Sequence, residues 1–273
     1  MKLRCLSLLL ISGLFLEITA DELSFKAMLR PGQPILIAHR GGVVGEGAPE
    51  CSLEAIRRAS RAGFQMVELD VRRSRDGTPF VFHDRDLLKA CGQSGSLEDY
   101  PAETISGFFL MPTRERIPTL EQALRLCREL ALGVMFDFKS GADDQEFLER
   151  IHTLLLQAKL TSAAITFTGE PLVRDVLKGV SFTPGKAQLQ SVFQGQVIDL
   201  SNAFWFGLPR HLSDAQAGQL VACGASLIPA INRFRYPGPD HMERARADVR
   251  RMMALGVDGF QIDAIYLPLF PPR

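Results

Sequence analysis

Residues 35–84 read ILIAHRGGVVGEGAPECSLEAIRRASRAGFQMVELDVRRSRDGTPFVFHD, and this stretch decides the fold. Its two apolar runs, 35–38 and 66–71, are typical of buried strands. The amphipathic segment 52–62 between them is typical of a helix that ends at Gly63. A strand, a helix and a second strand in this order predict a parallel βαβ unit.

The same alternation continues to the end of the chain. We expect further strands at 79–82, 134–138, 163–167, 189–193, 203–206, 226–231 and 259–262, and further helices at 119–132 (ended by Gly133), 143–159, 213–223 and 240–255. Seven or eight βα units in about 250 residues favour a (β/α)8 TIM barrel. An open doubly wound sheet fits less well, because no Gly-x-Gly-x-x-Gly phosphate loop is present.

The first twenty residues have the layout of a secretory signal peptide. Lys2 and Arg4 precede an apolar run over 6–16, and Ala20 offers a small residue before a cut at Asp21. The run is short for a membrane span, and an uncleaved anchor is the alternative. We therefore expect an exported protein, periplasmic or secreted, whose residues 21–273 form a single barrel domain without stable membrane insertion.

Charge and cysteine content narrow the function further. The 31 basic and 31 acidic residues balance, so no basic excess indicates a nucleic-acid partner. Four cysteines follow the first twenty residues, and sequence alone leaves three disulfide pairings open: they are Cys51, Cys91, Cys127 and Cys223. No C-x-x-C spacing occurs, so we do not expect a zinc site with thiolate ligands.

Three carboxylates form the strongest candidate for a metal site. Glu68 and Asp70 are two apart on a predicted strand, so both side chains point to the same face. Asp137 lies near the end of the next predicted barrel strand. Carboxylates that point together repel one another unless a cation joins them, and oxygen ligands suit Ca²⁺ or Mg²⁺. A solvated strand face is the alternative, disfavoured because 64–71 is otherwise apolar.

Histidines and cations surround these carboxylates. His39 and His83 stand at the ends of predicted strands, and imidazoles near a carboxylate cluster suit general acid–base catalysis. His152, His211 and His241 are expected on helix or loop surface. We also expect two cations to bind substrate phosphate, with salt bridges to nearby carboxylates as the alternative: Arg40 and Lys139.

The order of these elements resembles the glycerophosphodiester phosphodiesterase family. The resemblance rests on His39-Arg40-Gly41, Pro49-Glu50, Glu68-Leu69-Asp70, Asp76-Gly77 and His83-Asp84, and on the later segments 116–121, 136–139 and 256–263. It implies metal-dependent hydrolysis of a glycerophosphodiester to glycerol 3-phosphate and an alcohol. It also implies His39 and His83 as the acid–base pair, Glu50 as a ligand or an orienting group for Arg40, and an insertion over about 84–117.

The chain departs from the family pattern at three places. Asp137 stands where the family has Glu, Cys51 stands where it has Asn, and the loop between His39 and Glu50 is long. We interpret Cys51 as a small loop residue. These departures bear on the substrate, so a lysophospholipid- or phosphatidylinositol-cleaving enzyme is an alternative, with apolar surface at 108–111 or 204–206. A non-catalytic phosphoester-binding protein is another. The choice between Ca²⁺ and Mg²⁺ and the oligomeric state stay open.

Overall fold

The computed structural model describes residues 23–271, and the predicted signal peptide at 1–20 lies outside them. Its main sheet has the strand order β8-β7-β6-β2-β1-β11-β10-β9, and neighbours on this path are parallel. A parallel bridge between Phe182 and Ala203 joins β8 to the start of β9 and nearly closes the ring. The predicted (β/α)8 barrel is thereby confirmed. The barrel strands are β1 (Ile35–Ala38), β2 (Met66–Arg73), β6 (Gly133–Phe138), β7 (Ala164–Thr166), β8 (Ser181–Phe182), β9 (Phe204–Gly207), β10 (Ser226–Ile231) and β11 (Gly259–Ile262).

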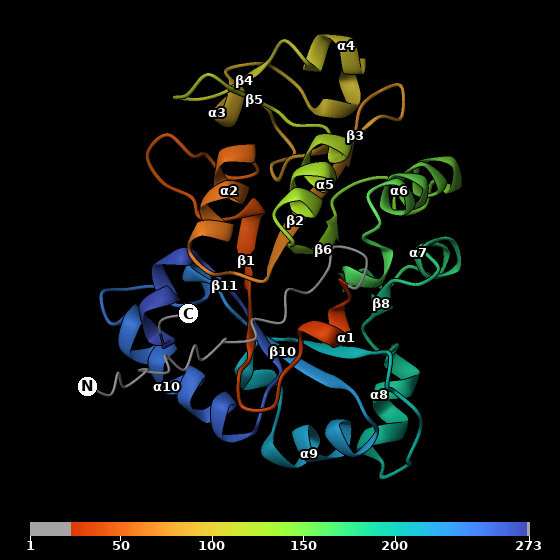
Figure 1. The fold of residues 1–273 in the computed structure, drawn as a ribbon, viewed down its shortest axis with the longest axis vertical. Coiled ribbons are helices and arrows are strands. Elements are labelled where there is room, and N and C mark those ends of the chain that lie inside the picture. Colours follow the sequence, from red (N-terminus) through yellow and green to blue (C-terminus); the bar gives the residue numbers. More distant parts are fainter. Residues whose placement is uncertain (1–22, 272–273) are drawn as a thin grey trace, which may run out of the picture.

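Helices surround this barrel in Figure 1. They are α2 (Leu53–Arg61), α5 (Leu120–Glu129), α6 (Gln145–Gln157), α7 (Pro171–Val176), α8 (Lys186–Phe193), α9 (Asp214–Ala222) and α10 (His241–Ala254). The short helix α1 (Phe25–Met28) instead packs its Phe25 on the apolar cluster inside the barrel. Polar side chains fix where several of them begin: Ser52, Thr119 and Asp144 each accept a hydrogen bond from a backbone N–H of the first turn. Within residues 23–271, no helix combines the length and apolar character needed to cross a bilayer.

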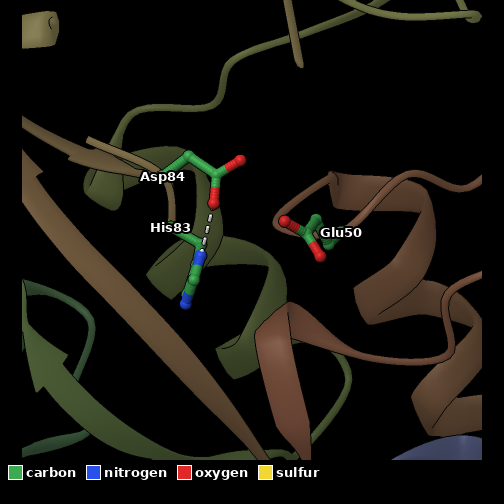
Figure 2. Close-up of side chains that lie close together, drawn as sticks. All are labelled: Glu50, His83 and Asp84. Carbon is green, nitrogen blue, oxygen red and sulfur yellow. Dashed lines mark hydrogen bonds and ion pairs between the residues drawn. The ribbon is translucent and has the colours of Figure 1, made fainter. Parts of the chain in front are cut away.

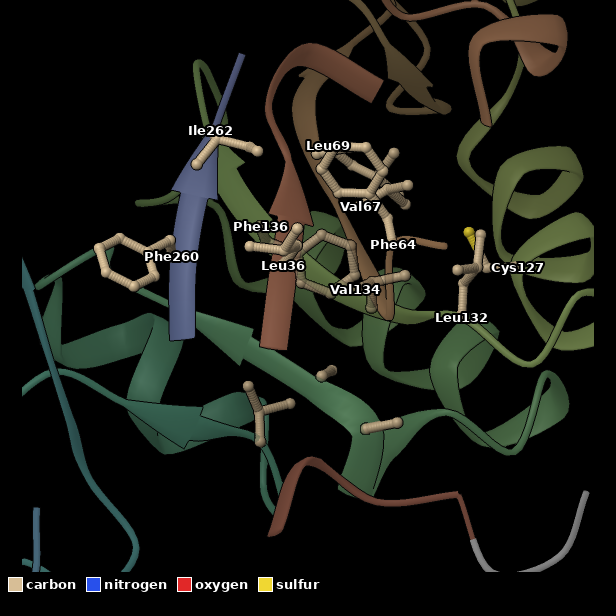
Figure 3. Close-up of a cluster of buried hydrophobic side chains, with 14 of the residues drawn as sticks. Leu36, Phe64, Val67, Leu69, Cys127, Leu132, Val134, Phe136, Phe260 and Ile262 are labelled. Atoms are coloured by element: carbon tan, nitrogen blue, oxygen red, sulfur yellow. The ribbon is translucent and has the colours of Figure 1, made fainter. Parts of the chain in front are cut away.

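Two apolar clusters follow from the alternation of side chains along the strands. Ile35 and Ile37 point into the barrel, where they pack with Phe25 of α1. Leu36 points outward into the larger cluster between strands and helices. Figure 3 shows part of this cluster, with Phe136 beside Leu36. The strands are thus buried on both faces, and the polar groups of the barrel gather at the ends of the strands.

Two details of the sequence prediction are wrong. The expected strand 189–193 is part of helix α8, because Leu189, Val192 and Phe193 have the i, i+3, i+4 spacing of one helical face and pack on the core together. Gly133 does not simply end a helix but begins β6, and the preceding turn has Ala131 at a φ of 53°. The two-residue strand β8 is too short to leave a periodic pattern.

An insertion follows β2, as expected for about 84–117. After β3 (Pro79–Val81) come α3 (Leu88–Cys91), α4 (Ala102–Ile105), β4 (Phe109–Leu110) and β5 (Glu115–Arg116). These elements have an apolar cluster of their own and lie at the top of Figure 1, above α2 and α5. The carboxylate of Asp76 accepts from the backbone N–H of Ala102, so the Asp-Gly motif anchors this insertion.

Candidate active site

The three predicted metal ligands meet at the ends of two neighbouring strands. Asp70 of β2 is in register with Asp137 of β6, and one oxygen from each of Glu68, Asp70 and Asp137 lies within 4.8 Å of the others. Glu68 and Asp70 are each only 1% exposed. The structure therefore brings Asp137 of β6 together with Glu68 and Asp70, which the two-residue spacing on β2 placed on one face.

This cluster carries more negative charge than the protein compensates. Lys139 Nζ lies 3.1 Å from Asp70 Oδ1 and 2.5 Å from Asp137 Oδ2, so the salt bridges considered for this lysine are formed. The backbone N–H of Arg40 donates to Glu68 Oε2 at 2.7 Å. Burial and the charge of Asp70 nevertheless raise the pKa of Glu68 well above its usual value. One ammonium group among three carboxylates leaves a charge and an oxygen donor set that fit a hard divalent cation.

Cys51 takes part in the same cluster as a neutral group. Its thiol donates to Asp70 Oδ2 at 3.5 Å, and its backbone φ is 61°. Burial, followed by the charge of Asp70, raises the pKa of the Cys51 thiol well above its usual value, so it stays protonated. All four described cysteines are free and buried, and none is a disulfide partner of another.

His39 and His83 are each held through Nδ1 by an aspartate. His39 Nδ1 lies 2.6 Å from Asp263 Oδ1, and His83 Nδ1 lies 2.7 Å from Asp84 Oδ1, the pair drawn in Figure 2. Asp263 also accepts from the backbone N–H of Arg233 at 2.5 Å. With Nδ1 as the donor to a carboxylate, Nε2 of each ring is the nitrogen left to exchange a proton with a ligand.

Asp263 was not among the predicted site residues, although it directly follows the last strand. It lies directly after β11 and is 26% exposed. Burial opposes its ionisation, but the hydrogen bond and charge of His39 outweigh burial and lower the pKa of Asp263. A carboxylate at the end of a barrel strand is a usable signal, because that edge forms the mouth of the barrel.

Glu50 connects the two sides of the mouth. Its Oε2 lies 2.8 Å from the Arg40 guanidinium, which is the orienting contact considered for it. It also has a carboxylate oxygen within 4.8 Å of ligand atoms of His83 and Asp84, and Figure 2 shows Glu50 facing this pair from the loop before α2. Burial disfavours the charged form of Arg40, but the hydrogen bond and the negative charge of Glu50 favour it. The net effect raises the pKa of Arg40, so the guanidinium stays charged.

A cavity of about 380 Å³ lies between these groups. It is lined by His39, Arg40, Glu68, His83, Asp137, Lys139, Phe167, Phe206, Gly207, Leu208, His211, Ala230, Asn232, Phe234, Arg235 and Gln261. The rings of Phe167 and Phe206 stack with centroids 4.6 Å apart and form an apolar part of its wall. His211 lines the cavity too, whereas His152 lies on α6 and His241 contacts Tyr266. The predicted catalytic and phosphate-binding side chains thus line one cavity together with two of the three predicted metal ligands, Glu68 and Asp137.

Comparisons with known proteins agree on one family. Residues 39–173 match the Glycerophosphoryl diester phosphodiesterase family. The chain is 35% identical to glycerophosphodiester phosphodiesterase 1 of Mus musculus over 149 residues, which cover 50% of this chain and 44% of the mouse protein. It is 33% identical to a probable glycerophosphodiester phosphodiesterase 2 of Mycobacterium tuberculosis over 114 residues, 42% of each chain. The chain thus spans less than half the length of these two curated relatives.

Solved structures share the fold over nearly the whole barrel. A glycerophosphoryl diester phosphodiesterase from Parabacteroides distasonis superposes with a TM-score of 0.69 at 20% identity, covering 93% of both chains. A phosphodiesterase from Oleispira antarctica, solved with its product sn-glycerol-3-phosphate, superposes with a TM-score of 0.66 at 19% identity, covering 89% of this chain and 96% of that one. At these identities the likeness concerns the architecture alone.

Proposed function

Because the chain belongs to the glycerophosphoryl diester phosphodiesterase family, we propose that it hydrolyses a glycerophosphodiester to glycerol 3-phosphate and an alcohol. One observation carries the proposal beyond family membership. Two imidazoles, each fixed through Nδ1 by a carboxylate, line a single cavity with a buried carboxylate cluster and two cationic side chains. Hydrolysis of a phosphodiester requires these groups, because the charge of the phosphate must be neutralised while protons are transferred at two oxygens.

The carboxylate cluster would hold a divalent cation, Ca²⁺ or Mg²⁺, through Glu68, Asp70 and Asp137. Such a cation neutralises phosphate charge and lowers the pKa of a coordinated hydroxyl. Asp137 has a shorter reach than a glutamate, but the close approach of its oxygen to those of Glu68 and Asp70 supports its role as a ligand. Lys139 and Arg40 would attract the phosphate oxygens, Lys139 as a point charge and Arg40 through its planar fork.

The two histidines would move the protons. One Nε2 accepts the proton of a substrate hydroxyl as its oxygen attacks phosphorus, while the other imidazolium gives its proton to the departing alcohol oxygen. The attack forms a cyclic phosphate, and the roles reverse when water opens it: the hydroxyl is regained and the product is glycerol 3-phosphate. Asp263 and Asp84 keep the imidazoles oriented and stabilise their protonated forms.

We further propose that the protein is exported, which the charged start, the apolar run 6–16 and Ala20 support. Edman sequencing of the protein from the exported fraction of its host is expected to begin near Asp21. A protein recovered in the membrane pellet with Met1 intact would contradict this proposal.

The substrate class is tested by product analysis with glycerophosphocholine. The proposal predicts glycerol 3-phosphate and choline, and loss of both products when chelator is added. Release of phosphocholine and glycerol would instead place the cleavage at the other ester bond, and binding without any product would indicate a phosphoester-binding protein. Turnover of a lysophospholipid alone would favour the lipid-cleaving alternative. His152 is a half-buried histidine of α6 that does not line the cavity, so His152→Ala is the matched control and should retain the wild-type rate.

A further inference from the structure

Asn232 is a buried amide that the proposed chemistry leaves unused. It follows β10 directly, is 4% exposed and lines the same cavity as His39 and His83. Its Nδ2 is one of three buried side-chain polar atoms within residues 23–271 that have no hydrogen-bond partner, and the other two are Arg40 Nε and Thr161 Oγ1. Buried donors are nearly always paired, because an unpaired one loses its hydrogen bonds to water without replacement.

The local fold offers no structural task for this side chain. Asn232 precedes the short turn Arg233–Arg235, yet its side chain makes no capping hydrogen bond there. The backbone carries the local contact instead, since the N–H of Arg235 donates to the carbonyl of Asn232 at 2.9 Å. An apolar side chain of similar size would fill the position without an unpaired donor, so the amide has to be explained by something that enters the cavity.

The surroundings of Asn232 differ from those of the carboxylates. The cluster of Glu68 and Asp137 lies on β2 and β6, while β10 is separated from β2 by β1 and β11 in the ring. The wall that includes Phe206 of β9, next to β10, is aromatic. A neutral amide that lines the same cavity as these aromatic rings suits an uncharged polyol, whose C–H groups pack on the rings while a hydroxyl oxygen accepts from the amide.

We propose that Asn232 is a specificity residue that donates from Nδ2 to the terminal hydroxyl of the glycerol half of the substrate. This inference rests on the proposed function and adds a division of labour to it. The carboxylate side of the cavity, with Lys139 and Arg40, takes the charged phosphate and the attacking hydroxyl. The Asn232 side takes the remaining hydroxyl and thereby distinguishes glycerol from a diol that lacks it.

The test compares two diesters that share the same attacking hydroxyl. Glycerophosphocholine has the terminal hydroxyl, and the phosphocholine diester of propane-1,2-diol lacks it but can still form the cyclic phosphate. Wild type is expected to prefer the glycerol substrate by roughly 10-fold in kcat/KM, the scale of one hydrogen bond lost from a buried donor. Asn232→Leu should reduce that preference to about 1, by slowing the glycerol substrate and not the diol.

A second measurement separates hydroxyl binding from phosphate binding. Calorimetry on the cation-loaded protein should show that Asn232→Leu weakens sn-glycerol 3-phosphate by roughly 10-fold and leaves inorganic phosphate unchanged. If Asn232→Leu fails to fold, Asn232→Asp keeps the shape but cannot donate when ionised, and it should also lose the preference for glycerol. Ser226→Ala, at the other end of β10, is the buried polar control and should keep both rates.

The outcomes are distinguishable from failure of the proposed function. If wild type turns over neither diester, the hydrolase proposal fails before Asn232 is examined. If wild type hydrolyses both and the preference for glycerol survives in Asn232→Leu or Asn232→Asp, the assignment of Asn232 is overturned. Equal weakening of sn-glycerol 3-phosphate and inorganic phosphate would overturn it as well, because the amide would then contact the phosphate.

Discussion

Replacing Asp263 with asparagine tests whether the His39 imidazole depends on its carboxylate partner. Asn has nearly the same shape, so the backbone N–H of Arg233 can still donate to its oxygen, but the negative charge 2.6 Å from His39 Nδ1 is lost. A hydrogen bond to a charged group contributes about 1.5–3 kcal/mol. If this support acts in the transition state, where the imidazole carries its extra proton, Asp263→Asn should lower kcat/KM by about 10- to 100-fold.

The assay follows choline release from glycerophosphocholine. A positioning role predicts a lower kcat, because the imidazolium has lost its stabilising neighbour. Asp263→Glu, which keeps the charge, should recover part of the rate. A wild-type rate in Asp263→Asn, with the variant folded, would refute the reasoning and leave this pair with a structural role only.

Further predictions concern catalysis, the cation and stability. His39→Ala and His83→Ala should each lose about 10²- to 10⁴-fold in rate while keeping fold and cation binding. A nitrophenyl diester, whose leaving group needs little protonation, should partly rescue only the variant that lacks the acid. Near-wild-type rates of both variants on glycerophosphocholine and on the nitrophenyl diester would reject the two-histidine mechanism. Glu68→Gln should weaken Ca²⁺ and Mg²⁺ binding in calorimetry yet raise the melting temperature of the chelator-treated protein, since burial and Asp70 make the Glu68 charge unfavourable without a cation; a lower melting temperature would contradict this. Because the pKa of Asp263 is lowered in the fold, the stability from its charge is present above the unfolded-state value of about 3.9 and is lost as pH falls through the folded-state pKa. Urea unfolding curves of wild type and Asp263→Asn should therefore converge as the pH falls below that folded-state pKa.

The barrel could be predicted because most of its strands are short apolar runs followed by amphipathic helices. The runs at 35–38, 226–231 and 259–262 coincide with β1, β10 and β11. Prediction failed where periodicity is weak. Residues 189–193 contain two β-compatible apolar residues close together, and only the helical packing of Leu189, Val192 and Phe193 on the core distinguishes the actual conformation.

The candidate site followed from sequence where function sets the local spacing. Glu68 and Asp70 share a face because strand side chains alternate, and parallel pairing of β2 with β6 then brings Asp137 to them. Contacts between residues that are distant in sequence could not be predicted. Asp263 meets His39 only because β11 closes on β1, and the unpaired amide of Asn232 is recognised only when every neighbour is in place.

The most direct test of the proposed site is the dependence of diester hydrolysis on an added divalent cation. The chelator-treated protein should release no glycerol 3-phosphate from glycerophosphocholine, and titration with Ca²⁺ or Mg²⁺ should restore the rate to saturation at one ion per chain. In Asp70→Asn the titration should require more cation or fail to restore the rate. An undiminished rate in excess chelator, or full recovery of Asp70→Asn at the wild-type cation concentration, would contradict a cation site built from these carboxylates.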